Sequence, residues 1–160
     1  MSPANSRNLV VDASVMCASG RTAHPVSKAS REALEAILQI CHHAVMTADI
    51  RREWEGRKSL FSEIWRAAME SKGKIHDLNG VDAAELSAAM MASSMDPSEF
   101  KLVEKDAHII NAALSSDKIL VTLDDRLKRT MEKYGSLASI AARIKWVNPV
   151  VEGSSIFENI

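Results

Sequence analysis

The chain has 160 residues, which is enough for one domain with a substantial core and too few for two ordinary domains. Hydrophobic residues make up 46% of it and charged residues 26%, as is typical of a soluble globular protein. The formal net charge of -1 excludes a strongly basic protein, so any affinity for nucleic acid has to come from a local patch.

The two ends of the chain predict a simple domain organisation. Residues 1 to 7 are a polar leader without the features of a secretory signal, and residues 150 to 160 are predicted to be a C-terminal tail. No stretch approaches the roughly 20 apolar residues that are needed to span a bilayer. Cys17 and Cys41 match no motif spacing. We therefore expect one domain over residues 8 to 149, a cytoplasmic location and no membrane partner.

The first predicted element is a strand over residues 8 to 13, in which three apolar residues lead directly into Asp12. Its continuous apolar character favours a central position in a sheet that is covered on both faces. A loop is expected from Ser19 to Pro25, followed by an amphipathic helix with Ser27 or Ser30 as its N-cap.

Two adjacent histidines, His42 and His43, end this helix. They invite interpretation as metal ligands, but no third ligand has a suitable spacing. We favour a surface position at the helix C-terminus, where cationic or polar groups suit the helix dipole.

A second strand over residues 44 to 46 leads into Thr47. Thr47 or Asp49 can cap the helix that follows, which carries Glu53 and has a possible break at Gly56. The helix ends near residue 73. Taken alone, Glu53 would be an ordinary solvated helix residue.

The middle of the chain contains two helix-start signals. Asp82 with Glu85 resembles a capping box, and Asp96 before Pro97 is typical of a helix N-terminus. Both aspartates are therefore expected to be caps, with Asp96 as the best spare acid for a site.

The stretch from residue 106 to 125 is predicted to be a short helix over residues 107 to 115, a turn, and a buried strand at 119 to 121. Asp106 lies in the first turn of that helix. The strand leads into Asp124 and Asp125. Because a short connection makes helix and strand antiparallel, Asp106 is expected near the carboxyl end of the strand.

Two further helices and a last short strand over residues 145 to 147 complete the pattern. Four strands alternating with helices predict an α/β fold, a three-layer α/β/α sandwich with a central, mostly parallel sheet of four to five strands.

Acids follow the carboxyl ends of several of these strands, where ligands bind in open α/β sheets. We expect four carboxylates to converge there, those of Asp12, Glu53, Asp106 and Asp124. Carboxylates packed together cannot all stay ionised without a compensating cation. Oxygen ligands favour Mg²⁺ or Mn²⁺ over zinc, as one or two ions.

Four segments in order, VVDASV, TADIRREWE, DAHIINAAL and VTLDD, resemble the signature blocks of PIN-domain ribonucleases. The resemblance covers residues 8 to 147 and is closest to stand-alone PIN proteins of the toxin type. It implies a PIN-like fold and metal-dependent hydrolysis of RNA. It also implies a cognate antitoxin as a candidate partner and leaves a homodimer open. We expect single-stranded or loop RNA as the substrate, since an A-form duplex hides its bases.

In this interpretation Asp12, Asp106 and Asp124 hold the metal, and Glu53 completes the ligand set or orients the attacking water. The resemblance makes Ser14 a supporting residue of the metal site, although an ordinary turn serine is an equal alternative. Thr122 supports the same edge. Asp125 is the alternative to Asp124, but the T-x-D spacing from Thr122 favours Asp124 as the ligand.

Basic residues flank these acids and predict a rim that contacts the phosphate backbone, with Arg51, Arg52 and Arg126 as candidates. Solvated helix faces are the alternative for each of them. His108 is expected to be an ordinary surface histidine.

Two other functions compete with a nuclease. A catalytically silent PIN-like module would bind RNA or a protein, with its acids serving as helix caps. A phosphoacceptor receiver-like domain also places acids at strand ends, but the paired acids after its first strand and its late lysine after a strand have no counterpart in this chain.

Overall fold

The computed structural model describes residues 5–160, so the first four residues of the predicted leader lie outside the described part of the chain. Its centre is a parallel sheet of five strands in the order β3-β2-β1-β4-β5. The strands are β1 (Asn8–Val11), β2 (His43–Met46), β3 (Ile75–Asp77), β4 (Ile119–Val121) and β5 (Lys145–Val147). The predicted α/β fold with a parallel sheet of four to five strands is confirmed.

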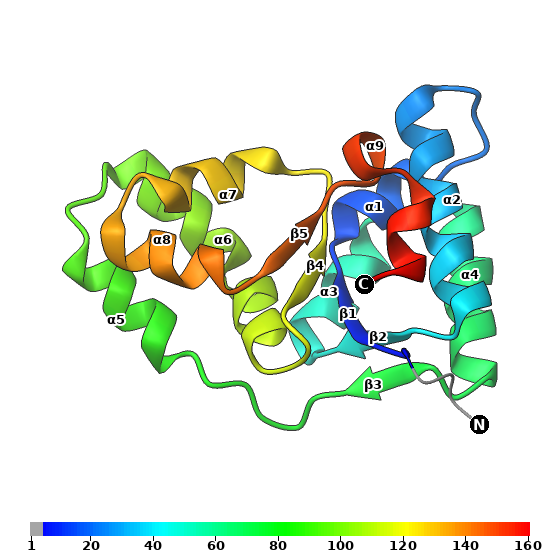
Figure 1. Cartoon of the computed structure of the whole chain (residues 1–160), viewed down its shortest axis with the longest axis horizontal. Helices are drawn as coiled ribbons and strands as arrows, with labels where there is room; N and C mark the ends of the chain where they lie inside the picture. The colour runs from blue at the N-terminus through cyan, green and yellow to red at the C-terminus, as the bar shows by residue number, and fades with distance from the viewer. Residues whose placement is uncertain (1–4) are drawn as a thin grey trace.

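Helices cover both faces of this sheet (Figure 1). The helices α1 (Ala13–Ala18), α2 (Pro25–Ile40) and α4 (Leu60–Ser71) lie on one side, where α2 packs against both α1 and α4. On the other side lie α6 (Pro97–Leu114), α7 (Asp125–Glu132) and α8 (Gly135–Ala142), with α5 (Ala84–Ala92) packed against α6 and α8. The helix α3 (Ala48–Gly56) contacts α1 and α6.

The strand order determines where a ligand site can form. From β1 the chain builds the sheet outward to β2 and β3, and then returns to the other side of β1 to add β4 and β5. Connections therefore leave β1 and β4 in opposite directions, which opens a crevice at their carboxyl ends. β1 and β4 are the strands that lead into Asp12 and Asp124.

The central strands read as continuous apolar runs because both of their faces are covered. Leu9, Val10 and Val11 in β1 and Leu120 and Val121 in β4 are each 0% exposed. The interior of a doubly covered parallel sheet requires such residues.

Several boundaries near the N-terminus differ from the prediction. The strand β1 ends at Val11, and residues 13–18 form the helix α1, which was not expected. α2 begins at Pro25, earlier than the predicted caps Ser27 and Ser30. Its first turn is stabilised by Pro25 at a position where a missing N–H costs nothing, and by the His24 side chain, which accepts from the Val26 N–H at 3.2 Å.

The predicted break near Gly56 is confirmed, since α3 ends there and Ser59 caps α4. Thr47 caps α3 by accepting from the Ile50 N–H at 3.1 Å. The strand β3 was not predicted, because its three residues, IHD, carry little apolar signal.

The helix that carries Asp106 is much longer than predicted. α6 runs without a break from Pro97 to Leu114, so Asp106 lies in its middle and not in its first turn. Asp96 caps α6 by accepting from the Ser98 N–H at 2.9 Å. No glycine or further proline interrupts residues 98 to 114, which is why the helix continues. The predicted capping box at Asp82 is absent from the described α5, although Asp82 accepts from the Ala84 N–H at 2.9 Å.

Residues 150 to 160 are not a loose tail. They contribute most of α9 (Pro149–Glu152) and the 3₁₀ helix η1 (Ser154–Glu158), which both pack on α2. The Phe157 side chain is 0% exposed. Within residues 5–160, none of the helices has the length and apolar character that a membrane crossing requires.

The packing of the C-terminal segment explains why the surface position predicted for His42 is wrong. His42 is 1% exposed and its Nδ1 accepts from the Arg7 N–H at 3.0 Å. The Nε2 therefore carries the proton and donates to the Phe157 carbonyl oxygen at 2.7 Å. His42 thus joins the C-terminal segment to the start of β1, while His43 is the first residue of β2.

Candidate functional site

The carboxyl ends of β1 and β4 border a pocket of about 360 Å³, which we call the acidic pocket. The four predicted acids come to it from four elements of the fold, together with one predicted supporting residue and three basic side chains. The acidic pocket is lined by Asp12, Ser14, Glu53, Arg57, Lys105, Asp106, Leu123, Asp124 and Arg126.

Asp12 is the most buried of these acids, at 8% exposed. Its Oδ2 accepts hydrogen bonds from the Ser14 hydroxyl at 2.7 Å and from the Thr122 hydroxyl at 2.8 Å. Its N–H donates to the Val121 carbonyl at 2.9 Å. Two hydroxyl donors on one oxygen orient the carboxylate and leave Oδ1 available.

Ser14 and Thr122 also connect the ends of the two strands. The Ser14 hydroxyl accepts from the Leu123 N–H at 3.2 Å, and the Thr122 hydroxyl accepts from the Asp124 N–H at 3.0 Å. Ser14 therefore bonds both to Asp12 and to the segment after β4. These contacts favour a supporting role over that of an ordinary turn serine.

The pKa of Asp106 reflects the burial and the charges of the acidic pocket. Burial raises the pKa of its carboxyl to about 6, and the neighbouring charges of Asp12, Asp124 and Glu53 act in the same direction, while Lys105 opposes them. A carboxylate whose pKa is raised by three others lies in a cluster of like charges.

Asp124 and Asp125 face different surroundings. Asp124 lines the acidic pocket and is the N-cap of α7, where its Oδ1 accepts from the Arg126 N–H at 2.9 Å. Both carboxylate oxygens of Asp125 accept from the Asn148 Nδ2 at 3.2 Å, and Asp125 lines a neighbouring pocket instead. Of the two adjacent acids, the structure thus brings Asp124 to the other three.

Glu53 reaches the acidic pocket from α3, which is anchored by its neighbour in sequence. The Trp54 indole N–H donates to the Val11 carbonyl at 2.9 Å, and the Trp54 side chain is buried. Local sequence patterns could not show this bond to the residue that precedes Asp12. The bond attaches α3 to the end of β1.

His108 is closer to the site than expected. Its Nε2 lies 3.1 Å from Glu53 Oε1, and its side chain is 18% exposed, which contradicts an ordinary surface histidine. Both ring nitrogens nevertheless lack a hydrogen-bond partner among the described residues. We regard the two side chains as neighbours without a formed hydrogen bond.

The basic rim differs in part from the predicted one. Arg126 lines the acidic pocket as expected, together with Arg57 and Lys105. Arg51 and Arg52 do not line it; they pair with Asp77 at 3.6 Å and with Asp49 at 2.9 Å. Helical spacing explains the difference, since positions four residues apart share a face and Arg57 is four residues after Glu53.

The donor set suits a hard divalent cation, because carboxylate oxygens dominate it. Within residues 5–160, no three acid, histidine or cysteine side chains are already arranged to hold an ion, so the carboxylates would have to turn toward a common point. The raised pKa of Asp106 is the observation in favour of a fit, because a cation would relieve the repulsion that causes part of it.

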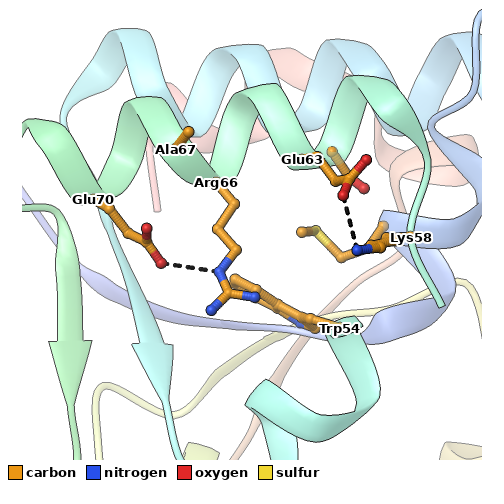
Figure 2. A pocket seen from close by; sticks show the side chains of 8 residues that line it. Trp54, Lys58, Glu63, Arg66, Ala67 and Glu70 are labelled. Atoms are coloured by element: carbon orange, nitrogen blue, oxygen red, sulfur yellow. Dashed lines mark hydrogen bonds and ion pairs between the residues drawn. The ribbon is translucent and has the colours of Figure 1, made fainter. Parts of the chain in front are cut away.

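A second pocket, of about 190 Å³, lies between α3 and α4 (Figure 2). Its two cations are paired, Lys58 with Glu63 at 2.8 Å and Arg66 with Glu70 at 3.0 Å, as Figure 2 shows. None of the predicted site residues lines this pocket. Its charges are compensated internally, in contrast to those of the acidic pocket.

Comparisons with protein-family models, with curated proteins and with solved structures found no match to this chain.

Proposed function

We propose that this chain is a divalent-metal-dependent endoribonuclease that hydrolyses phosphodiester bonds in single-stranded or loop RNA. The observation that carries the proposal is the like-charge cluster at the crevice between β1 and β4, where burial together with the charges of Asp12, Asp124 and Glu53 raises the pKa of Asp106. Acids that disfavour one another's ionisation indicate a place where a cation is needed. A metal-dependent hydrolase uses such a place.

Each residue of the acidic pocket has a role in this proposal. Asp12, Asp106 and Asp124 would hold Mg²⁺ or Mn²⁺, and Ser14 and Thr122 keep the Asp12 carboxylate oriented. A bound ion would lower the pKa of its water and neutralise charge on the phosphate. Glu53, which lines the same pocket, would orient the attacking water or accept its proton.

Substrate binding would depend on the cations of the pocket rim. Arg57, Lys105 and Arg126 surround the acids and supply positive charge for the phosphates on either side of the cleaved bond. The cleft lies at one edge of a small domain, which suits a single strand better than the wide surface of an A-form duplex. A cognate antitoxin and a homodimer belong to the same proposal as partners of a toxin-type nuclease.

The test is cleavage of a mixed RNA pool with and without Mn²⁺. Wild type should cut only with metal, and Asp12→Asn should not cut. Asp49→Asn is a matched control, because Asp49 lies on α3 close to Glu53 in sequence but is an exposed acid outside the acidic pocket. It should retain most of the activity.

The competing function is a silent module that binds RNA or a protein. Metal-independent binding of RNA by wild type, with no cleavage in Mn²⁺ or Mg²⁺, would favour that alternative. Loss of activity in Asp49→Asn as complete as in Asp12→Asn would mean that neither result reports on the acidic pocket.

A further inference from the structure

His108 contacts an acid of the acidic pocket without lining the pocket itself. The ring projects from α6, and its Nε2 lies 3.1 Å from Oε1 of Glu53 on α3. Glu53 lines the acidic pocket, whereas His108 does not. A substrate bound in the pocket would therefore meet Glu53, and the histidine could act only through that carboxylate.

The burial of the His108 ring argues against both ordinary roles of a histidine. Its two ring nitrogens are buried and have no hydrogen-bond partner among residues 5–160, so they are not hydrated as those of a surface histidine would be. A core histidine bonds to fixed partners, as His42 does with Arg7 and Phe157. The acceptor available to His108 Nε2 is Glu53 Oε1, which lies within hydrogen-bond distance.

Glu53 lacks the hydrogen bonds that orient two of the other acids. Asp12 accepts from two hydroxyl groups, and Asp124 accepts from the Arg126 N–H. The Glu53 side chain is 31% exposed and, within the described part of the chain, pairs with no lysine or arginine. A carboxylate that orients a water or accepts its proton has to be held in one position. Glu53 therefore needs a partner that fixes it.

The contact also determines which nitrogen of His108 carries the proton. With the proton on Nδ1 alone, the Nε2 lone pair would face the Glu53 carboxylate and be repelled by it. With the proton on Nε2, the same contact becomes attractive. Because the atoms are already at hydrogen-bond distance, a turn of either side chain completes the bond. Hydrogen bonds in catalytic sites often align fully only when substrate is bound.

We propose that His108 is a positioning residue, which donates from Nε2–H to Glu53 Oε1 and leaves Oε2 to contact the attacking water. The inference rests on the proposed nuclease function, in which Glu53 orients that water or accepts its proton. His108 itself touches neither substrate nor water. Its neutral ring is sufficient for this role, since one N–H is all that the bond requires.

The first experiment detects the contact without any cleavage. Long-range ¹H–¹⁵N NMR spectra of the full chain, recorded at pH 8 without metal, identify the protonated nitrogen of each histidine ring, and the His108→Gln variant assigns the His108 signals by their loss. The proton should be on Nε2. The Nε2 signal should shift in Glu53→Ala, because the acceptor is removed. A proton on Nδ1 alone, or signals that do not change in Glu53→Ala, would overturn the proposal.

The second experiment measures single-turnover cleavage of RNA in Mn²⁺. His108→Leu fills the space without a donor and should slow cleavage by about tenfold or more, the effect typical of removing a group that orients a site residue. His108→Gln, whose amide N–H takes the place of Nε2–H, should retain most of the rate. His76→Leu, in β3 and outside the acidic pocket, is the matched control and should leave the rate unchanged.

A double variant separates positioning from a general structural effect. In a Glu53→Ala background, His108→Leu should cause no further loss, because no carboxylate remains to be positioned. An equal loss in both backgrounds would overturn the proposal, as would full activity of His108→Leu. Thermal melts identify any variant that fails to fold, and the NMR result then decides. Failure of the nuclease proposal has a different signature, which is a His108 signal that depends on Glu53 in a wild-type protein that does not cleave RNA in Mn²⁺.

Discussion

The pKa of the single side chain Asp106 responds to the charges of the other acids in the acidic pocket. Its position in the middle of α6 could not be predicted, because the sequence signals for the helix start lie ten residues earlier, at Asp96 and Pro97. Its convergence with Asp12 and Asp124 could be predicted, because strand direction places both of those acids at one edge. Helical spacing could also have identified Arg57 as the rim residue beside Glu53.

The raised pKa of Asp106 makes a prediction about stability in metal-free buffer. A carboxyl with a folded-state pKa of about 6, above its unfolded value, favours folding while it is protonated, and this contribution is lost as the pH rises through 6. Asp106→Asn should therefore be more stable than wild type at pH 8, by about 1–2 kcal/mol after discounting for partial solvation, with less difference at pH 4. Urea unfolding with EDTA measures it. A variant less stable than wild type at pH 8 would assign Asp106 a structural role.

The different surroundings of Asp124 and Asp125 predict unequal effects on cleavage. Asp124→Asn should remove activity yet fold normally, because asparagine is as good an N-cap for α7 as aspartate. Asp125→Asn should retain at least about a tenth of the rate, since each factor of ten corresponds to about 1.4 kcal/mol of transition-state stabilisation. Single-turnover cleavage of one RNA by both variants measures this. The opposite order of severity would identify Asp125 as the metal ligand.

At the scale of elements, buried apolar strands were predictable even where they are short. The three residues of β4 are all buried and all apolar, whereas the three residues of β3 are partly exposed and only Ile75 is apolar. The sequence predicts a C-terminal tail because the apolar residues after Pro149 follow neither a helical nor a strand period. Its burial depends on His42, a contact between residues 115 positions apart that local patterns cannot reveal.

This C-terminal contact predicts a large loss of stability when it is removed. Phe157→Ala should destabilise the protein by about 3–5 kcal/mol, because a fully buried aromatic side chain is replaced by a cavity. Phe157→Leu should cost less, and Val150→Ala, at a side chain that is 47% exposed, should stay within about 0.5 kcal/mol. Urea denaturation of the three variants measures the differences. Near-zero effects for both Phe157 variants would mean that the segment is a tail after all.

At the scale of the whole molecule, the strand order brings distant parts of the chain to one edge. The acidic pocket lies there, lined by acids that are up to 112 positions apart in the chain, Asp12 and Asp124. The net charge of -1 gives no overall attraction to RNA, so the local cations have to provide it. Sequence composition could predict that a patch was needed, but only the fold selects which cations form it.

The distribution of these cations predicts how RNA binding depends on salt. Each phosphate contact contributes about 0.7 to the slope of log affinity against log salt for a single strand. Arg57→Ala combined with Arg126→Ala should therefore reduce the slope by about 1.4. Arg51→Ala combined with Arg52→Ala should change it much less, because those side chains pair with Asp77 and Asp49 outside the acidic pocket. Gel shifts of single-stranded and duplex RNA between about 50 and 200 mM salt measure the slopes, with the single strand expected to bind more tightly. A larger effect of the Arg51 and Arg52 pair would move the binding surface away from the acidic pocket, toward the exposed face of α3.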